Sequence, residues 1–105
     1  MRPEHSMNPI IEANRPEIIA LCRKYGVIKL DLFGSAAGPD WDPETSDFDF
    51  VVDFDKHRSG MFVRFIDFGD EMERLLGRRV DLVSEKRMKP RFRRAVDDTR
   101  VALLA

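Results

Sequence analysis

The chain has 105 residues, of which 43% are hydrophobic and 35% charged, a composition typical of one folded domain rather than a disordered segment. Its 18 basic and 19 acidic residues leave a net charge of −1, which argues against direct nucleic-acid binding through bulk charge. The single cysteine, Cys22, excludes an internal disulfide, and no apolar run reaches the roughly 18–20 residues of a membrane span, so we expect a cytoplasmic protein without membrane contact.

The N-terminal part is predicted to contain a tail followed by a helix. Residues 1–8 lack the apolar core of a signal peptide and are expected to form a flexible tail, which leaves residues 9–105 as a single domain. Asn14 and Glu17 stand three residues apart, as the two members of a capping box do at the start of a helix. The apolar spacing that follows is helical, and Gly26 is expected to end the helix.

The middle of the chain is predicted to form two strands joined by a long loop. Residues 27–33 alternate, which places one set of side chains on the same face of a strand: Ile28, Leu30 and Leu32. Residues 34–45 are rich in Gly, Pro and Asp and are predicted to be loop, with one helical turn after Ser35. Residues 47–54 predict the second strand, whose apolar face carries Phe48, Phe50, Val52 and Phe54.

The C-terminal half is predicted to add two helices and two strands. An apolar stripe predicts a helix over residues 61–76, which Gly77 ends. A strand over 78–84, a helix over about 85–97 and a short strand over 99–103 complete the chain. This order predicts an α/β (α+β) fold in which helices cover one face of a small mixed β-sheet.

Two aspartates, Asp47 and Asp49, stand one residue apart at the start of the most apolar strand. Residues i and i+2 of a strand point to the same face, so the two carboxylates lie side by side, opposite the apolar face. Such carboxylates repel each other unless a cation lies between them, and a divalent ion is the natural partner. Asp81 interrupts another apolar strand and joins the pair if the two strands are neighbours. The alternative is that the pair consists of acids exposed at a loop edge.

Gly34 and Ser35 provide a complement to these acids. A glycine at the end of a strand lets the backbone approach a triphosphate closely, and the amides of Ser35 and Ala36 at the start of a helical turn would face its β- and γ-phosphates. Three carboxylates supply oxygen ligands for one or two Mg²⁺ ions, which would act on an attacking hydroxyl and a leaving pyrophosphate. The alternative is that Gly34 is a simple turn and Ser35 a helix cap.

Three segments in this order resemble the small nucleotidyltransferase domains of the DNA polymerase β superfamily: Leu32-Phe33-Gly34-Ser35, Ser46-Asp47-Phe48-Asp49 and Val80-Asp81-Leu82-Val83. More narrowly, the chain is similar over nearly its whole length to the minimal nucleotidyltransferases (MNT) of the antitoxin type. The resemblance implies the polymerase-β-like fold and Mg²⁺-dependent transfer of a nucleoside monophosphate, AMP from ATP, to a hydroxyl. In the antitoxin branch it implies adenylylation of a tyrosine on a partner HEPN-domain toxin, an RNase, as in type VII-like systems.

The resemblance also implies roles for five residues of this chain. Asp47, Asp49 and Asp81 match the catalytic acids that bind two Mg²⁺ ions, and Gly34 and Ser35 match the residues that bind the nucleotide. On these matches we expect the nucleotide to be held between the acids and the Gly-Ser turn.

The chain departs from the family pattern after the Gly-Ser-x-Ala segment. Many members carry an arginine and a glycine there, where this chain has Gly38 and Pro39. Either Arg64, Arg78 or Arg79 replaces the missing cation, or nucleotide affinity or rate is reduced.

Two functions therefore stay open, an active protein adenylyltransferase and an antitoxin that neutralises its toxin by binding alone. A third is transfer to RNA or a small molecule, and the NTP, the acceptor and the homo- or hetero-oligomeric state are not defined by the sequence. The basic run over residues 87–94 is either a solvated helix face or a contact for phosphates or an acidic partner.

Overall fold

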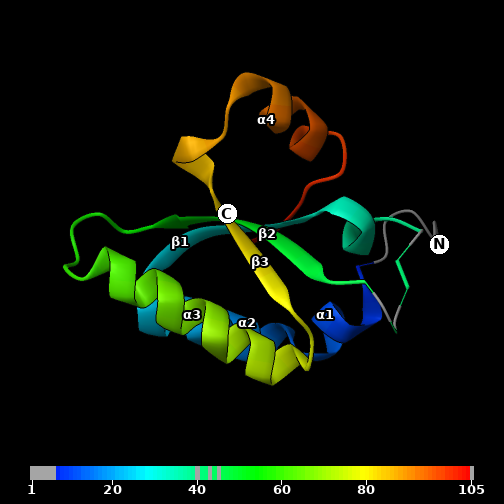
Figure 1. Ribbon diagram of the computed structural model, residues 1–105. Helices are drawn as coiled ribbons and strands as arrows, with labels where there is room; N and C mark the ends of the chain where they lie inside the picture. Colours follow the sequence, from blue (N-terminus) through cyan, green and yellow to red (C-terminus); the bar gives the residue numbers. More distant parts are fainter. Residues whose placement is uncertain (1–6, 40, 43, 45, 105) are drawn as a thin grey trace.

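The computed structural model describes residues 7–39, 41–42, 44 and 46–104, and the chain order of its elements follows the predicted one with one helix added (Figure 1). Its helices are α1 (Pro9–Ala13), α2 (Arg15–Tyr25), α3 (Met61–Leu76) and α4 (Pro90–Asp97). Its strands are β1 (Val27–Phe33), β2 (Phe48–Phe54), β3 (Val80–Ser84) and β4 (Val101–Leu104). Two 3₁₀ turns, η2 (Gly34–Ala37) and η3 (Glu85–Arg87), follow β1 and β3.

The four strands form one mixed sheet in the order β3-β2-β1-β4. β1 runs antiparallel to both β2 and β4, and β2 runs parallel to β3. The parallel pair is possible because α3 carries the chain back along the sheet between β2 and β3, as a crossover helix does. The predicted mixed α/β fold is thus confirmed.

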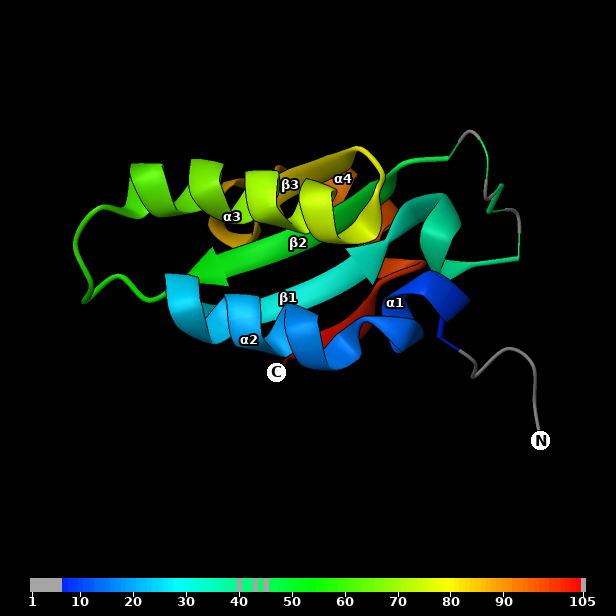
Figure 2. The same cartoon turned by 90° about the horizontal axis from the view of Figure 1, so that it is seen from below.

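Helices α1, α2 and α3 lie on one face of the sheet, and α4 lies on the other (Figures 1 and 2). Four alternating apolar side chains of β2 point to the first face, those of Phe48, Phe50, Val52 and Phe54. They are buried against the helices together with Ile18, Phe68 and Met72. The expected cover of one face by helices therefore holds for α1, α2 and α3, whereas the predicted C-terminal helix, observed as α4, lies on the opposite face. Within the described part of the chain, no helix combines the length and apolar character that crossing a bilayer requires.

The N-terminal segment is more ordered than predicted. Residues 1–6 of the expected tail lie outside the described residues, but Asn8 is 8% exposed and caps α1, a helix that we did not predict. Its Oδ1 accepts hydrogen bonds from the N–H groups of Ile10 (3.0 Å) and Ile11 (3.4 Å). The predicted capping box at Asn14 is wrong, because the Asn14 amide instead donates to the Ile10 carbonyl (2.8 Å) and closes α1.

Two local predictions fail for backbone reasons. The register of β1 shifts between Val27 and Lys29, so Val27 is buried and Ile28, expected inside, is 49% exposed. The helix expected over residues 85–97 is broken before Pro90. A residue that precedes proline is forced into extended backbone, and Lys89 has ψ 154°. The segment therefore forms η3 first and α4 afterwards.

A network of ion pairs attaches η3, α4 and the segment before β4 to the sheet. Arg100 donates to Asp31 of β1 (2.8 Å) and to Asp97 (2.7 Å), and it also pairs with Glu85, which binds Arg93 as well. Asp31 is 4% exposed, so its charge depends on Arg100 for compensation. Burial raises the pKa of Glu85, but the hydrogen bonds from Arg100 and Arg93 outweigh it and hold the pKa at about 2.

We predict that Glu85→Gln lowers the free energy of unfolding at pH 7 by about 1–2 kcal/mol, because Arg100 and Arg93 lose a charged partner at a partly solvated site. The pKa of Glu85 is lowered from 4.5 to about 2 in the folded state, so its contribution is present above pH 4.5 and is lost as the pH falls towards 2. Urea unfolding of the unmodified chain and of Glu85→Gln should therefore give a difference in the free energy of unfolding that becomes smaller below pH 4.5. Glu44→Gln, which changes an exposed loop carboxylate, is the control. A difference in the free energy of unfolding between the unmodified chain and Glu85→Gln that does not change with pH would contradict the account.

Candidate functional site

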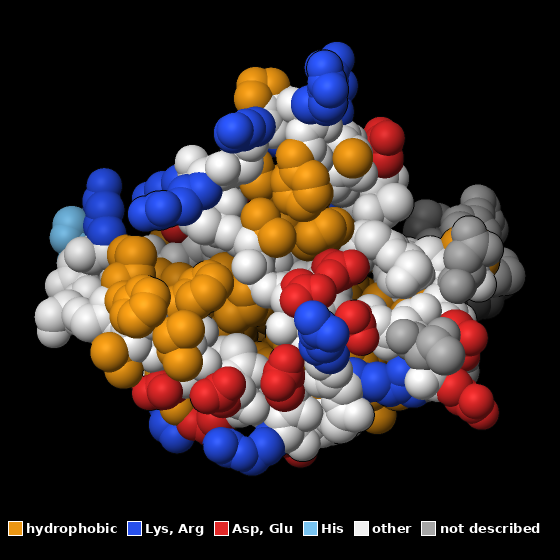
Figure 3. Space-filling model, in the orientation of Figure 1, with side chains coloured by type: hydrophobic (Ala, Val, Ile, Leu, Met, Phe, Trp, Pro, Cys, Tyr) orange, Lys and Arg blue, Asp and Glu red, His pale blue; other side chains and the backbone are white. Residues whose placement is uncertain are grey.

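Three residues form a row across the face of the sheet that α4 borders. Asp49 of β2 pairs with Asp81 of β3 on one side and with Phe33 of β1 on the other. Paired residues on neighbouring strands point to the same face, so Phe33, Asp49 and Asp81 stand side by side. We call this set the acid row. Figure 3 shows acidic side chains grouped on this side of the molecule, below apolar side chains under α4.

The carboxylates of the site affect one another. Burial, the charge and hydrogen bond of Asp81, and the charge of Asp47 together raise the pKa of Asp49 from its ordinary 3.8 to about 6. Asp81 and Asp47 are therefore both close enough to Asp49 to affect its charge. Across residues 7–39, 41–42, 44 and 46–104, no three His, Cys, Asp or Glu side chains converge closely enough to form a metal-binding group. The acids are neighbours with the right donor chemistry for a hard cation, and their mutual repulsion is what a divalent ion would relieve.

The Gly34 turn lies directly against Asp49. A Cβ built on Gly34 would stand 2.8 Å from the Asp49 Oδ2 atom, and the φ of Gly34 is +76°, so both space and backbone require glycine. The turn continues as η2, which confirms the helical turn expected after Ser35. The end of β1 thus lies beside Asp49 of β2, and β3 places Asp81 on the other side of Asp49.

Two residues that the sequence analysis did not single out hold this turn. The Gly34 N–H donates to the Thr99 Oγ1 atom (2.9 Å), and the Asn8 amide donates to the Ala36 carbonyl (3.4 Å). These partners are 65 and 28 residues away from the turn in sequence. No local pattern marks them, because both contacts depend on how distant segments pack.

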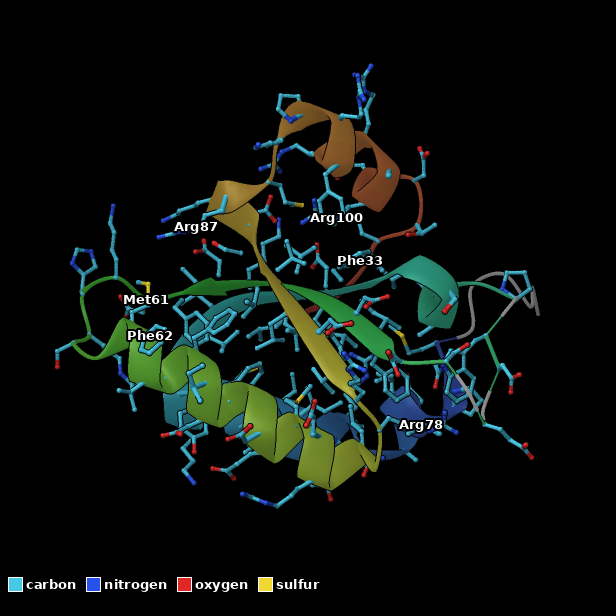
Figure 4. The ribbon with its side chains drawn as sticks, viewed as in Figure 1. Phe33, Met61, Phe62, Arg78, Arg87 and Arg100 are labelled. Atoms are coloured by element: carbon cyan, nitrogen blue, oxygen red, sulfur yellow. The ribbon has the colours of Figure 1, made fainter. Side chains whose placement is uncertain are left out.

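Arg78, which Figure 4 places at the end of the molecule where α3 gives way to β3, contacts two described residues of the segment between the turn and Asp47. Arg78 donates to the Ser46 carbonyl (3.1 Å) and lies over the Trp41 ring, 5.6 Å from its centre. The Trp41 ring stacks on Phe48 with centres 5.4 Å apart, so Trp41 packs against the start of β2. Arg78 therefore anchors the residue immediately before Asp47.

The three arginines considered as replacements for the missing cation are in different situations. Arg64 is 8% exposed and its guanidinium donates to four backbone carbonyls, those of Tyr25, Asp55, Arg58 and Ser59. Arg64 and Arg78 are both committed to the backbone. Arg79 is exposed, two residues before Asp81, and its guanidinium has no partner within the described part of the chain.

Comparison with known proteins identifies the chain's relatives. A family model of the nucleotidyltransferase domain matches residues 18–103. A protein of Methanocaldococcus jannaschii assigned as a protein adenylyltransferase is 30% identical over 94 residues, which are 89% of this chain and 93% of that protein. The protein adenylyltransferase MntA of Thermococcus cleftensis is 36% identical over 80 residues, 76% of this chain and 75% of MntA.

Solved structures agree with these relatives. One described as a minimal nucleotidyltransferase has a TM-score of 0.74 and 32% identity, with 92% of this chain and 96% of that chain covered. An MNT antitoxin in complex with a tri-AMPylated HEPN toxin of Shewanella oneidensis has a TM-score of 0.64 and 20% identity, covering 90% of this chain and 71% of that one. A toxin–antitoxin structure with AMP-PNP has a TM-score of 0.67 and 22% identity over 88% and 73% of the two chains. The last two similarities show a shared fold only.

We predict that Gly34→Ala lowers the free energy of unfolding by about 1–3 kcal/mol, because the methyl group meets Asp49 and the backbone is in the left-handed region. Gly38→Ala, four residues along the same loop, is the matched control, since a Cβ there meets nothing within 4 Å. Chemical denaturation of the two variants measures the difference. Equal stability of Gly34→Ala and Gly38→Ala would show that the close approach of turn and acid is not present in solution.

Proposed function

The chain belongs to the nucleotidyltransferase domain family, and from this we propose that it is an MNT-type antitoxin that transfers AMP from ATP to a tyrosine hydroxyl of a partner HEPN-domain toxin. The observation that carries the proposal is the contact between the Gly34 turn and Asp49, with Asp47 and Asp81 beside it. Relatives named protein adenylyltransferases at 30% and 36% identity support the protein as acceptor. The neighbouring fold with a tri-AMPylated HEPN toxin supports the partner.

In this proposal Asp47, Asp49 and Asp81 would hold two Mg²⁺ ions. Their clustered charge, seen in the raised pKa of Asp49, fits this donor set. Bound Mg²⁺ would neutralise charge on the triphosphate and make the acceptor hydroxyl a better nucleophile. ATP, the second small molecule required, would lie with its phosphates between the acids and the Gly34 turn.

The chain's own groups would orient the reactants. The first N–H groups of a 3₁₀ turn have no partner within the turn, so the Ser35 and Ala36 amides and the Ser35 hydroxyl are available to the phosphates. The Gly34 N–H is not, because it donates to Thr99. The acceptor oxygen bonds to the α-phosphorus as the bond to the β-phosphate oxygen breaks, pyrophosphate leaves, and the hydroxyl proton passes to Asp81, the exposed acid of the row.

A second function, neutralisation of the toxin by binding alone, is favoured by one specific observation. The usual cation after the Gly-Ser turn is replaced by Gly38 and Pro39, and both Arg64 and Arg78 are engaged by the backbone. We assign the vacant phosphate-binding role to Arg79. If Arg79 does not fill it, occlusion becomes the better account.

The transfer itself is tested by co-expression with a HEPN-domain partner and intact mass spectrometry of that partner. We predict additions of AMP with the unmodified chain and a loss of at least about 100-fold with Asp47→Asn/Asp49→Asn, because the ions lose two ligands. Asp53→Asn is the control, since Asp53 lies on the same strand but pairs with Lys86 (3.8 Å) outside the site. Full transfer by the double variant would overturn the site. Neutralisation without any mass change would favour occlusion.

The role of Arg79 is tested separately. We predict that Arg79→Ala raises the KM for ATP about tenfold without changing the free energy of unfolding, because it removes an exposed charge that pairs with no other described group of the chain. Arg78→Ala should instead shift the fluorescence of Trp41, the chain's single tryptophan, since it loses the ring contact. A KM for ATP that Arg79→Ala leaves unchanged would remove Arg79 from the site.

A further inference from the structure

We propose that Phe92 of α4 and Phe33 of β1 form an aromatic wall that holds the nucleobase of the bound nucleotide. The inference rests on the proposed function, since it extends the same nucleotide site. It assigns a base-binding role to Phe33, which precedes Gly34 in the Gly-Ser segment, and to Phe92, which lies outside every motif of the sequence analysis. The wall is defined here as these two rings alone.

The first element of the argument is the position of Phe33. It is the Cα partner of Asp49 in the antiparallel ladder and directly precedes Gly34. Figure 4 shows Phe33 on the side of the sheet that faces α4, below Arg100. A nucleotide whose phosphates lie at Gly34 and Asp49 therefore has this ring as its immediate neighbour.

The second element is the unused surface of Phe92. Its ring meets Phe33 edge to face, with centres 6.1 Å apart and planes at 89°, so the contact leaves a ring face uncovered. Phe92 is 43% exposed, whereas Val96, one helical turn further along, is 1% exposed. Val96 is therefore the fully buried apolar contact of α4, whereas much of the Phe92 side chain stays accessible to a ligand.

The third element is the rigid attachment of α4 to the nucleotide site. Arg93 of α4 binds the Glu85 carbonyl (2.7 Å) and its carboxylate, and Arg100 joins Glu85 to Asp31. Just after α4, Thr99 accepts the hydrogen bond of the Gly34 N–H. The wall and the phosphate turn are thus connected through several independent contacts, which fixes their separation.

The other exposed apolar surface does not share this position. Met61, Phe62, Val63 and Ile66 at the start of α3 are 43–78% exposed, and Figure 4 places Met61 and Phe62 at the end of the molecule away from Phe33. No contact in the structure says what covers that surface. It provides a matched control, because Phe62 is an exposed phenylalanine far from the acids.

The wall would bind a flat aromatic ring. Two reactants carry one, the nucleotide in its base and the acceptor in its tyrosine. The observations favour the base, because Phe33 adjoins the phosphate turn and the base is covalently joined to those phosphates. Base stacking on aromatic side chains tolerates different bases, so the wall adds affinity for nucleosides over bare phosphates.

The experiment compares ATP with inorganic tripolyphosphate, both with Mg²⁺, by isothermal titration calorimetry. We expect the unmodified chain to bind ATP more tightly than tripolyphosphate. Phe92→Ala and Phe92→Leu should weaken ATP binding about 5–100-fold and leave tripolyphosphate binding unchanged. Phe92→Trp keeps an aromatic ring at this position and should bind ATP about as tightly as the unmodified chain. Phe92→Leu retains apolar packing on Phe33, so it separates the aromatic face from a structural role. Phe62→Ala should change neither affinity.

Each contrary outcome has a distinct meaning. Equal losses for ATP and tripolyphosphate would show that Phe92 only supports the phosphate turn, and unchanged ATP binding would overturn the assignment. If the Phe92 variants bind ATP normally but have a raised KM for the acceptor, the wall binds the aromatic ring of the acceptor and the assignment to the nucleobase is wrong. ATP binding no tighter than tripolyphosphate in the unmodified chain would overturn the wall and leave the site intact, whereas binding of neither would overturn the proposed function itself.

Discussion

Repulsion between carboxylates is the constraint on which the rest of this structure depends. Asp49 stands between its strand neighbour Asp81 and the preceding Asp47, in a partly buried position that raises its pKa to about 6. A fold selected for stability alone would separate such groups, because each carries a cost when ionised beside the others. The arrangement is explained if the acids share divalent ions, as we propose for this member of the nucleotidyltransferase domain family.

The two faces of the sheet divide the work of stability and function. On one face, Phe50 and Val52 of β2 pack with Phe68 of α3 in an apolar core. None of these three side chains belongs to the candidate site. The other face carries the acid row. Of the described helices, α4 borders this face, and the ion pairs of Arg100 and Glu85 attach it. Polar attachment keeps this side open to a ligand while still placing α4 at a defined distance from the Gly34 turn.

The predictable features were those that local pattern determines. The limits of α3 follow from its apolar stripe and Gly77, and the meeting of Gly34 with the acids follows from motif order and strand alternation. The failures have other causes. Ile28 points outward because the pairing of β1 with β2 contains a register shift, which the sequence alone does not reveal. Asn14 donates its side-chain amide to a carbonyl of α1, a helix that the sequence analysis did not predict. Thr99, Asn8 and Phe92 lie far along the chain from what they contact, so only the folded register reveals them. The end of the helical backbone before Pro90 could have been predicted from the sequence, because proline disfavours a helical conformation in the residue that precedes it.

The central claim is that Asp47, Asp49 and Asp81 bind divalent ions together with a nucleotide triphosphate at the Gly34 turn. The most direct measurement is an anomalous difference map from a crystal grown with Mn²⁺ and a non-hydrolysable ATP analogue. The account predicts two metal peaks coordinated by these carboxylates, with the analogue's phosphates against the Ser35 and Ala36 amides. A nucleotide bound elsewhere on the molecule, or a site with no metal at Asp49, would contradict it.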